Sequence, residues 1–245
     1  MTAGTRRADL TLDPRQLAVS WHRLGLGAPP AELVSSADDG LSLPAPPVED
    51  LAPALTLLAT AQREVALHVS SPRQWAVAVA SGDAGLLAVR SGNLIRLRRA
   101  FGTALPRLIV GIAPTHRAGP GRSVSVPSAV FDEACGRAAT GTEELATALR
   151  TRRVRATDAE TLGNMLTGIT GGGQFTAAMR DRTGRRHQAA HPVSFLDTER
   201  GRYLLEQRAT YDGSSWTTVA PGNQARVTAQ VQRLLADLSR TLGWD

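Results

Sequence analysis

Residues 173–223, GQFTAAMRDRTGRRHQAAHPVSFLDTERGRYLLEQRATYDGSSWTTVAPGN, decide the fold of this chain. Turn-forming residues divide the segment at 181–184, at 197–201 and at Asp212-Gly213. Asp and Gly are favoured in such turns because Asp hydrogen-bonds to its own backbone and Gly accepts positive φ. Between the turns, apolar and polar residues alternate, as in strands that bury one face. The pattern predicts four strands of one antiparallel sheet, at 173–180, 187–197, 202–210 and 215–219.

The rest of the chain is predicted to contain a second set of strands with helices before and after it. In the first half, we expect helices at 14–24, 48–61 and 103–112, and strands at 64–70, 75–80, 86–90 and 94–100. In the second half, helices at 128–138, 142–152 and 157–167 precede the strands, and a helix at 223–242 follows them. Asp13 before Pro14 has the composition of a helix N-cap, and Thr157 with Glu160 that of a capping box. Residues 27–47, rich in Pro, Ser, Asp and Gly, predict an irregular connection.

This repeated order predicts an α+β fold with two pseudo-symmetric subdomains, each an antiparallel strand meander flanked by helices. We expect an N-terminal half at 1–115, a linker at 116–127 and a C-terminal half at 128–245. The linker assignment depends on Gly and Pro residues without hydrophobic periodicity. The two meanders are expected to join or to pack around a shared core.

The basic composition suggests one function that the sequence does not otherwise support. All 28 basic residues are arginine, and the net charge is +6. They form only short clusters, at 96–99, 150–155 and 182–186, and aromatic residues make up 4% of the chain, too few for a base-stacking platform. An arginine-rich nucleic-acid-binding protein remains the alternative function, and a steep salt dependence of binding would distinguish it.

Motifs of catalysis are missing from the sequence. The histidines have no metal-ligand spacing, and no serine lies in a G-x-S-x-G motif. Gly171-Gly172-Gly173 follows a predicted helix and precedes a strand, the reverse of a phosphate-binding loop, so it is expected to break the helix. The single Cys135 is expected to be a small buried hydrophobe. We therefore expect no enzyme, no metal and no cofactor.

No apolar run reaches the length of a membrane span, and no signal peptide is recognisable. The sequence therefore predicts a cytoplasmic protein without membrane insertion.

The last third also carries a resemblance to a known family. It lies in Gly173-Gln174-Phe175, Arg180-Asp181, Gly184-Arg185-Arg186 and residues 193–198, 201–204 and 216–221. The first half agrees at Trp21, at Gly82-Asp83 and at residues 87–90, and residues 121–127 are similar to the family's linker. These segments resemble the EspG family of ESX (type VII) secretion-associated chaperones of actinobacteria.

The resemblance implies a cytosolic, non-enzymatic chaperone with a pseudo-two-fold α+β fold. Such a chaperone binds a PE/PPE-type helical heterodimer at the apolar tip of the PPE protein, keeps the pair soluble and guides its export. It uses no cofactor. We expect PE/PPE-type partners, no nucleic acid, and a monomer or weak homodimer.

The predicted partner-binding site is the turn between the first two strands, together with helices of the second half. Its residues are Ser70, Ser71, Pro72, Arg73, Gln74 and Trp75. In relatives this loop helps to contact the PPE tip, but here the loop 70–74 is short, as is the connection 27–47. Arg and Trp are enriched in binding hot spots, although Trp75 could equally belong to the core.

Overall fold

The structure is a computed structural model that describes residues 9–34 and 46–243. The elements of the first half are β1 (Leu10–Leu12), α1 (Pro14–Arg23), α2 (Ala31–Val34), α3 (Val48–Thr60), β2 (Arg63–Ser70), β3 (Arg73–Ser81), β4 (Ala84–Ser91), β5 (Leu94–Phe101), η1 (Gly102–Ala104) and α4 (Leu105–Val110). Those of the second half are β6 (Val124–Pro127), α5 (Ser128–Ala139), α6 (Leu145–Thr151), α7 (Ala156–Leu166), β7 (Ile169–Arg180), β8 (Arg186–Gln188), β9 (Val193–Thr198), β10 (Gly201–Ala209), β11 (Ser215–Pro221) and α8 (Gln224–Thr241). In the described residues, each half begins with a short strand and helices, continues with a meander and ends with a helix.

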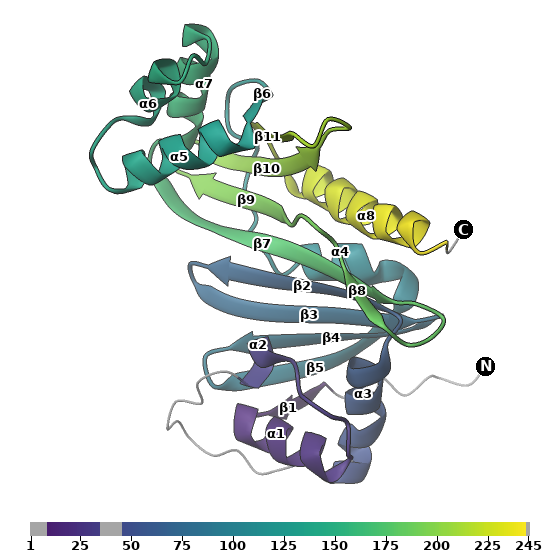
Figure 1. The fold of residues 1–245 in the computed structure, drawn as a ribbon. Coiled ribbons are helices and arrows are strands. Elements are labelled where there is room, and N and C mark those ends of the chain that lie inside the picture. Colours follow the sequence, from purple (N-terminus) through teal and green to yellow (C-terminus); the bar gives the residue numbers. More distant parts are fainter. Residues whose placement is uncertain (1–8, 35–45, 244–245) are drawn as a thin grey trace, which may run out of the picture.

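All the strands belong to one 11-stranded sheet (Figure 1). Its order is β1-β5-β4-β3-β2-β7-β9-β10-β11-β6, with β8 beside β7, and the strands pair antiparallel. The two meanders meet where β2 pairs with β7 along 63–69, and each half ends at its own short first strand. The predicted α+β class with antiparallel meanders is confirmed, and the two meanders join edge to edge.

Three local predictions were wrong. The strand expected at 187–197 is interrupted between β8 and β9, where Pro192 has no amide hydrogen to donate to a ladder. The glycines at 171–173 lie inside β7 rather than breaking the helix before it. The connection 27–47, expected to be irregular, contains α2, while its residues 35–45 lie outside the described residues.

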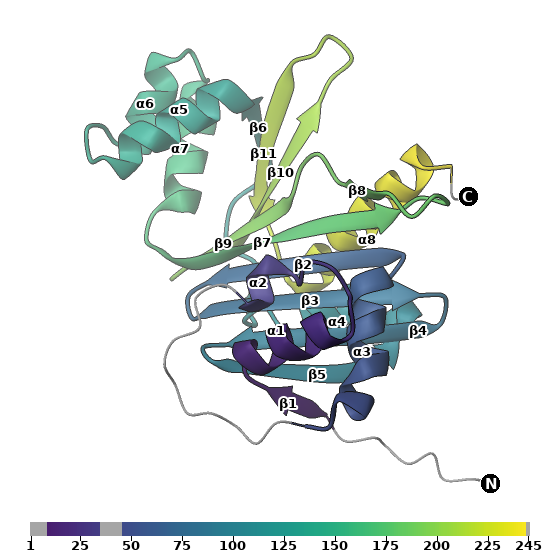
Figure 2. The ribbon, with the colours of Figure 1, turned by 60° about the horizontal axis from the view of Figure 1, so that its bottom comes forward.

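Helices cover both faces of the sheet (Figure 2). On β3, side chains alternate between a cluster with α1 and α3 (Val77, Val79) and a cluster with α4 and α8 (Ala76, Ala78). We call the face with α1–α3 the front face and the opposite one the back face. The helices α5–α7 pack over β10, β11 and β6 through Tyr203 and Val219, which the strand register places on the front face too. Because both faces are covered, β3 is buried almost continuously.

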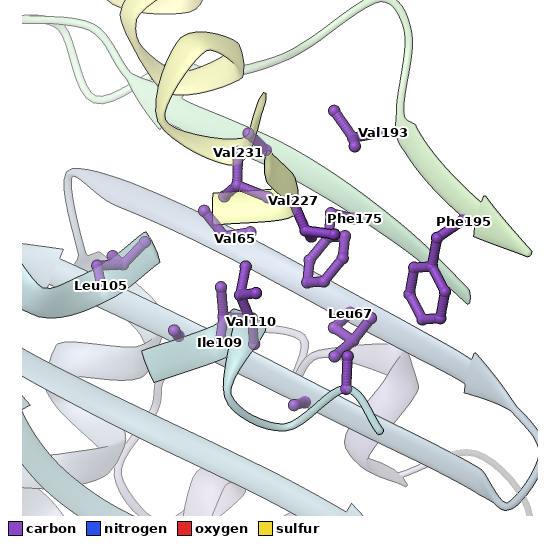
Figure 3. Packing of buried hydrophobic residues seen from close by; sticks show 14 of the residues in the cluster. Val65, Leu67, Leu105, Ile109, Val110, Phe175, Val193, Phe195, Val227 and Val231 are labelled. Atoms are coloured by element: carbon purple, nitrogen blue, oxygen red, sulfur yellow. The ribbon is translucent and has the colours of Figure 1, made fainter. Parts of the chain in front are cut away.

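The central cluster belongs to both halves of the chain (Figure 3). Val65 and Leu67 from β2 and Phe175 from β7 pack against α4 and α8, which contribute Ile109 and Val231. The two faces of the sheet are therefore held differently, with one shared cluster on the back and a separate cluster for each half on the front.

The predicted linker 116–127 is packed against β10. The Arg202 guanidinium is fully buried and holds Asp197 through Nε (2.6 Å) and Nη2 (2.8 Å), and Nη2 also donates to the Pro114 carbonyl. Tyr203 Oη donates to the carbonyl of Pro120 at 3.0 Å, and its ring lies against Gly119. At the end of the segment, β6 pairs with β11. Whether 1–115 and 128–245 are separate domains remains a prediction.

Gly173 on β7 tests how tightly the junction is packed. A Cβ there would lie 2.6 Å from both the His68 carbonyl oxygen and the Phe195 ring. We expect Gly173→Ala to destabilise the fold by about 1–3 kcal/mol, since the extra methyl group overpacks the site. The control is Gly136→Ala in α5, where a Cβ meets nothing within 4 Å and should stabilise by about 0.5–1 kcal/mol. Urea unfolding measures both changes, and equal effects would contradict the packing.

Candidate functional site

The predicted site residues form a tight turn between β2 and β3. Ser70 pairs with Arg73, so the turn itself consists of Ser71 and Pro72. The four residues are exposed. Ser70 Oγ donates a hydrogen bond to the Gly172 carbonyl at 3.0 Å, which ties the turn to β7. The turn is therefore a fixed corner of the sheet.

The structure does not bring all six predicted residues together. Because β3 begins at Arg73, alternation places Arg73 and Trp75 on the front face and Gln74 on the back face. Gln74 Nε2 donates to Ser91 Oγ at 2.8 Å there. A partner on the front face would therefore meet Arg73 and Trp75 without meeting the side chain of Gln74.

Trp75 stacks on His68, its cross-strand neighbour on β2. The ring centroids are 3.9 Å apart and the planes differ by 21°. Trp75 is half-buried and lies outside the three hydrophobic clusters of the described residues. Burial and the charge of Arg73 lower the pKa of His68 below its usual value near 6.5. The imidazole is therefore mostly neutral at pH 7, and covering it does not desolvate a charge.

Sequence reasoning did not find His68 or the next residue in this row, Gln174 on β7. His68 pairs with Gln174, which is exposed. Together, Ser70, Arg73, Trp75, His68 and Gln174 form what we call the central surface. It lies at the 68–70 end of β2, between the front-face cluster of the first half and that of the second half. The two halves are seen together in Figure 2. The alternating pattern could place His68 on one face, but the partner strand of β2 comes from a distant segment.

The helices α5–α7 stand beside this surface as a cross-linked group. Arg152 pairs with Glu133 at 2.5 Å, which joins α6 to α5. Arg122 pairs with Asp158 at 2.5 Å and fixes the start of α7 to the segment before β6. The Asp158 carboxylate thus accepts a hydrogen bond from Arg122. The predicted capping box at 157–160 does not form, because α7 begins at Ala156 without a side-chain cap. This group positions Ile169, which is 52% exposed at the start of β7.

Arginines in two of the three clusters pair with carboxylates. Arg150, Arg152 and Arg155 pair with Glu160, Glu133 and Asp158. In the cluster at 182–186, Arg186 pairs with Glu64 at 2.7 Å, whereas Arg182 and Arg185 form no ion pair within the described residues. Paired guanidinium groups on different elements do not form the continuous basic track that a nucleic-acid backbone requires.

The described residues show little that could perform acid–base or metal chemistry. No group of three His, Cys, Asp or Glu residues among them could hold a metal ion. Cys135 is half-buried, and burial raises the pKa of its thiol to about 11, so it stays protonated. No helix in this part of the chain is both long and apolar enough to span a bilayer.

These features define an α+β protein built on a single antiparallel sheet, with helices on both faces and an open strip between two front-face helical layers. Within that class, the chain belongs to the EspG family, whose sequence model matches residues 31–233. Among solved structures, it is similar to the Mycobacterium tuberculosis type VII secretion system chaperone EspG5, in complex with a PE25–PPE41 dimer. The match has a TM-score of 0.70 at 18% identity and covers 93% of this chain and 96% of EspG5. No curated protein matches significantly.

Proposed function

We propose that this chain is a cytoplasmic, non-enzymatic chaperone of a type VII secretion system that binds a PE/PPE-type helical pair and covers an apolar tip of the PPE protein. Membership of the EspG family is the observation that carries the proposal. The likeness in fold to EspG5, whose solved structure contains a PE25–PPE41 dimer, supports it.

In this proposal, the central surface makes the main contact. Trp75 offers an aromatic face, and stacking on His68 holds its ring in place, so little side-chain entropy is lost on binding. Arg73 is exposed beside it and can reach carbonyl or carboxylate groups of the partner. The polar residues Ser70 and Gln174 keep the surface wettable when no partner is bound.

The helices α5–α7 provide the second part of the proposed contact. Ile169, between α7 and the sheet, adds an exposed apolar side chain next to the polar strip. A surface of mixed polarity suits a chaperone that stays soluble alone and later releases its cargo. We expect an interface of roughly 800 Å² per partner or more.

Co-expression with a PE/PPE-type pair encoded in the same genome tests the function. We expect more soluble pair when the chain is present, because a covered apolar patch cannot self-associate. A stoichiometric complex should elute from size-exclusion chromatography without added nucleotide. If the pair is equally soluble alone and no complex survives the column, the chain is not its chaperone.

A further inference from the structure

In the arginine cluster at 96–99, none of the arginines forms an ion pair within the described residues. Arg96 and Arg98 are exposed, and neither forms an ion pair with any residue in the ranges 9–34 and 46–243. Arg99 belongs to the same run, but alternation along β5 separates it from them. It pairs opposite Leu86 of the front-face cluster, whereas Arg98 pairs opposite Leu87 of the shared back-face cluster. Among the described residues, the back face of the first half therefore carries two arginines without a carboxylate partner.

A hollow lies between these arginines and α4. Its volume is about 320 Å³, and apolar side chains from β4, from β5 and from Ile112, which follows α4, line it beside the guanidinium groups. We call it the arginine groove and define it by Leu87, Val89, Leu94, Arg96, Arg98 and Ile112. Asp9, Gln74 and Ser91 complete its lining. An apolar floor next to two cations calls for an occupant with both apolar and anionic side chains.

We propose that the arginine groove binds an amphipathic helix of a partner protein, which presents two carboxylates four residues apart beside apolar side chains. The site lies on the face opposite the central surface, so both could be occupied at once. The inference does not depend on the proposed function.

The strand pairing and the neighbouring layers favour a helix as the occupant. β5 is paired with β4 along its length and with β1 at 95–97, so an added strand could pair with it over residues 98–101 at most. The same face is covered elsewhere by helices, namely α4 with 6 residues and α8 with 18 residues. The short α4 leaves the adjoining part of β4 and β5 without such a cover.

The spacing of the two arginines matches a helix. Residues two apart on a strand are separated by about 7 Å. Carboxylates at positions i and i+4 of a helix are separated by about 6 Å, so each can meet one guanidinium group. Arg96 and Arg98 would then select acidic helices over basic ones by charge complementarity.

A nucleic acid fits the groove less well. Its backbone would place several phosphates along a track, but the groove offers two arginines beside an apolar floor. No Phe, Tyr or Trp lines the hollow to stack on a base.

The test uses two labelled 18-residue helical peptides with a leucine face, one with glutamates at i and i+4 and one with lysines there. Fluorescence anisotropy with the full chain should give a Kd at least tenfold lower for the glutamate peptide. The double variant Arg96→Glu/Arg98→Glu should reverse this preference. Arg96→Gln/Arg98→Gln should remove the preference. This milder variant keeps the test valid if the first variant does not fold.

Arg99→Glu is the matched control, because it makes the same charge change in the same strand but on the front face. It should keep the wild-type preference for the glutamate peptide. The proposal is overturned if the wild type binds both peptides equally, or if Arg99→Glu acts like the double variant. Displacement of the peptide by a single-stranded oligonucleotide would identify the groove as a nucleic-acid site and would also overturn it. These outcomes do not depend on the result of the PE/PPE co-expression assay, so the two proposals can fail separately.

Discussion

Partner recovery should fall roughly 30-fold or more when Trp75 is replaced by Ala and Arg73 by Glu, since losing a hot spot costs about 2 kcal/mol or more. The double variant removes the aromatic face and reverses the charge at the centre of the proposed contact. Neither side chain belongs to the hydrophobic clusters, so the fold should melt within a few degrees of wild type. Co-purification of the PE/PPE-type pair and a thermal melt measure the two effects.

Gln74→Glu is the control for this experiment. It changes the residue between Arg73 and Trp75, but its side chain lies on the back face, hydrogen-bonded to Ser91. We expect it to leave partner recovery unchanged. Equal losses from Gln74→Glu and from the double variant would mean that the front face does not make the contact.

The largest effect on stability is expected from Arg202→Ala. The buried guanidinium forms an ion pair with Asp197, and Asp197 is only 4% exposed. The guanidinium also lies 4.1 Å from the centre of the Phe195 ring and donates a hydrogen bond to the Pro114 carbonyl. Its removal leaves the Asp197 carboxylate buried without its cation, at a cost of about 3–5 kcal/mol. That is a large fraction of the total stability of a typical domain. Chemical denaturation monitored by circular dichroism measures the loss.

The double variant Arg202→Met/Asp197→Leu separates the cost of an unpaired charge from a general loss of packing. Well-packed apolar side chains often replace a buried ion pair without destabilisation. We therefore expect it to be more stable than Arg202→Ala alone. If it is less stable, the network around Pro114 and Phe195 contributes more than the ion pair.

Local signals made the strands predictable. The alternating pattern and the turn residues predicted β10 and β11 to within a few residues, and Asp13 forms the expected N-cap with a capping box to Gln16. β1 has three residues and too little pattern to be recognised. The pairing of β2 with β7 joins residues as distant as Arg63 and Met179, and nothing local in the sequence encodes such a register.

For the site, too, local patterns were predictable and long-range strand pairing was not. Its hairpin was predictable, but the predicted strand began at Trp75, so Arg73 and Gln74 were treated as parts of a turn. Because β3 in fact begins at Arg73, the two residues point to opposite faces. His68 joins the surface through the pairing of β2 with β3, and Gln174 through the pairing of β2 with β7 across the two halves.

The shared back-face cluster also constrains how the chain folds during translation. The first half leaves the ribosome before its neighbours exist, so β2 emerges with one unpaired edge until β7 follows. Val227 and Val231, which complete the cluster, lie in the last helix and emerge last. A nascent chain that stalls before α8 therefore carries an open edge and an incomplete core, the two features that bring quality-control chaperones and proteases to a polypeptide.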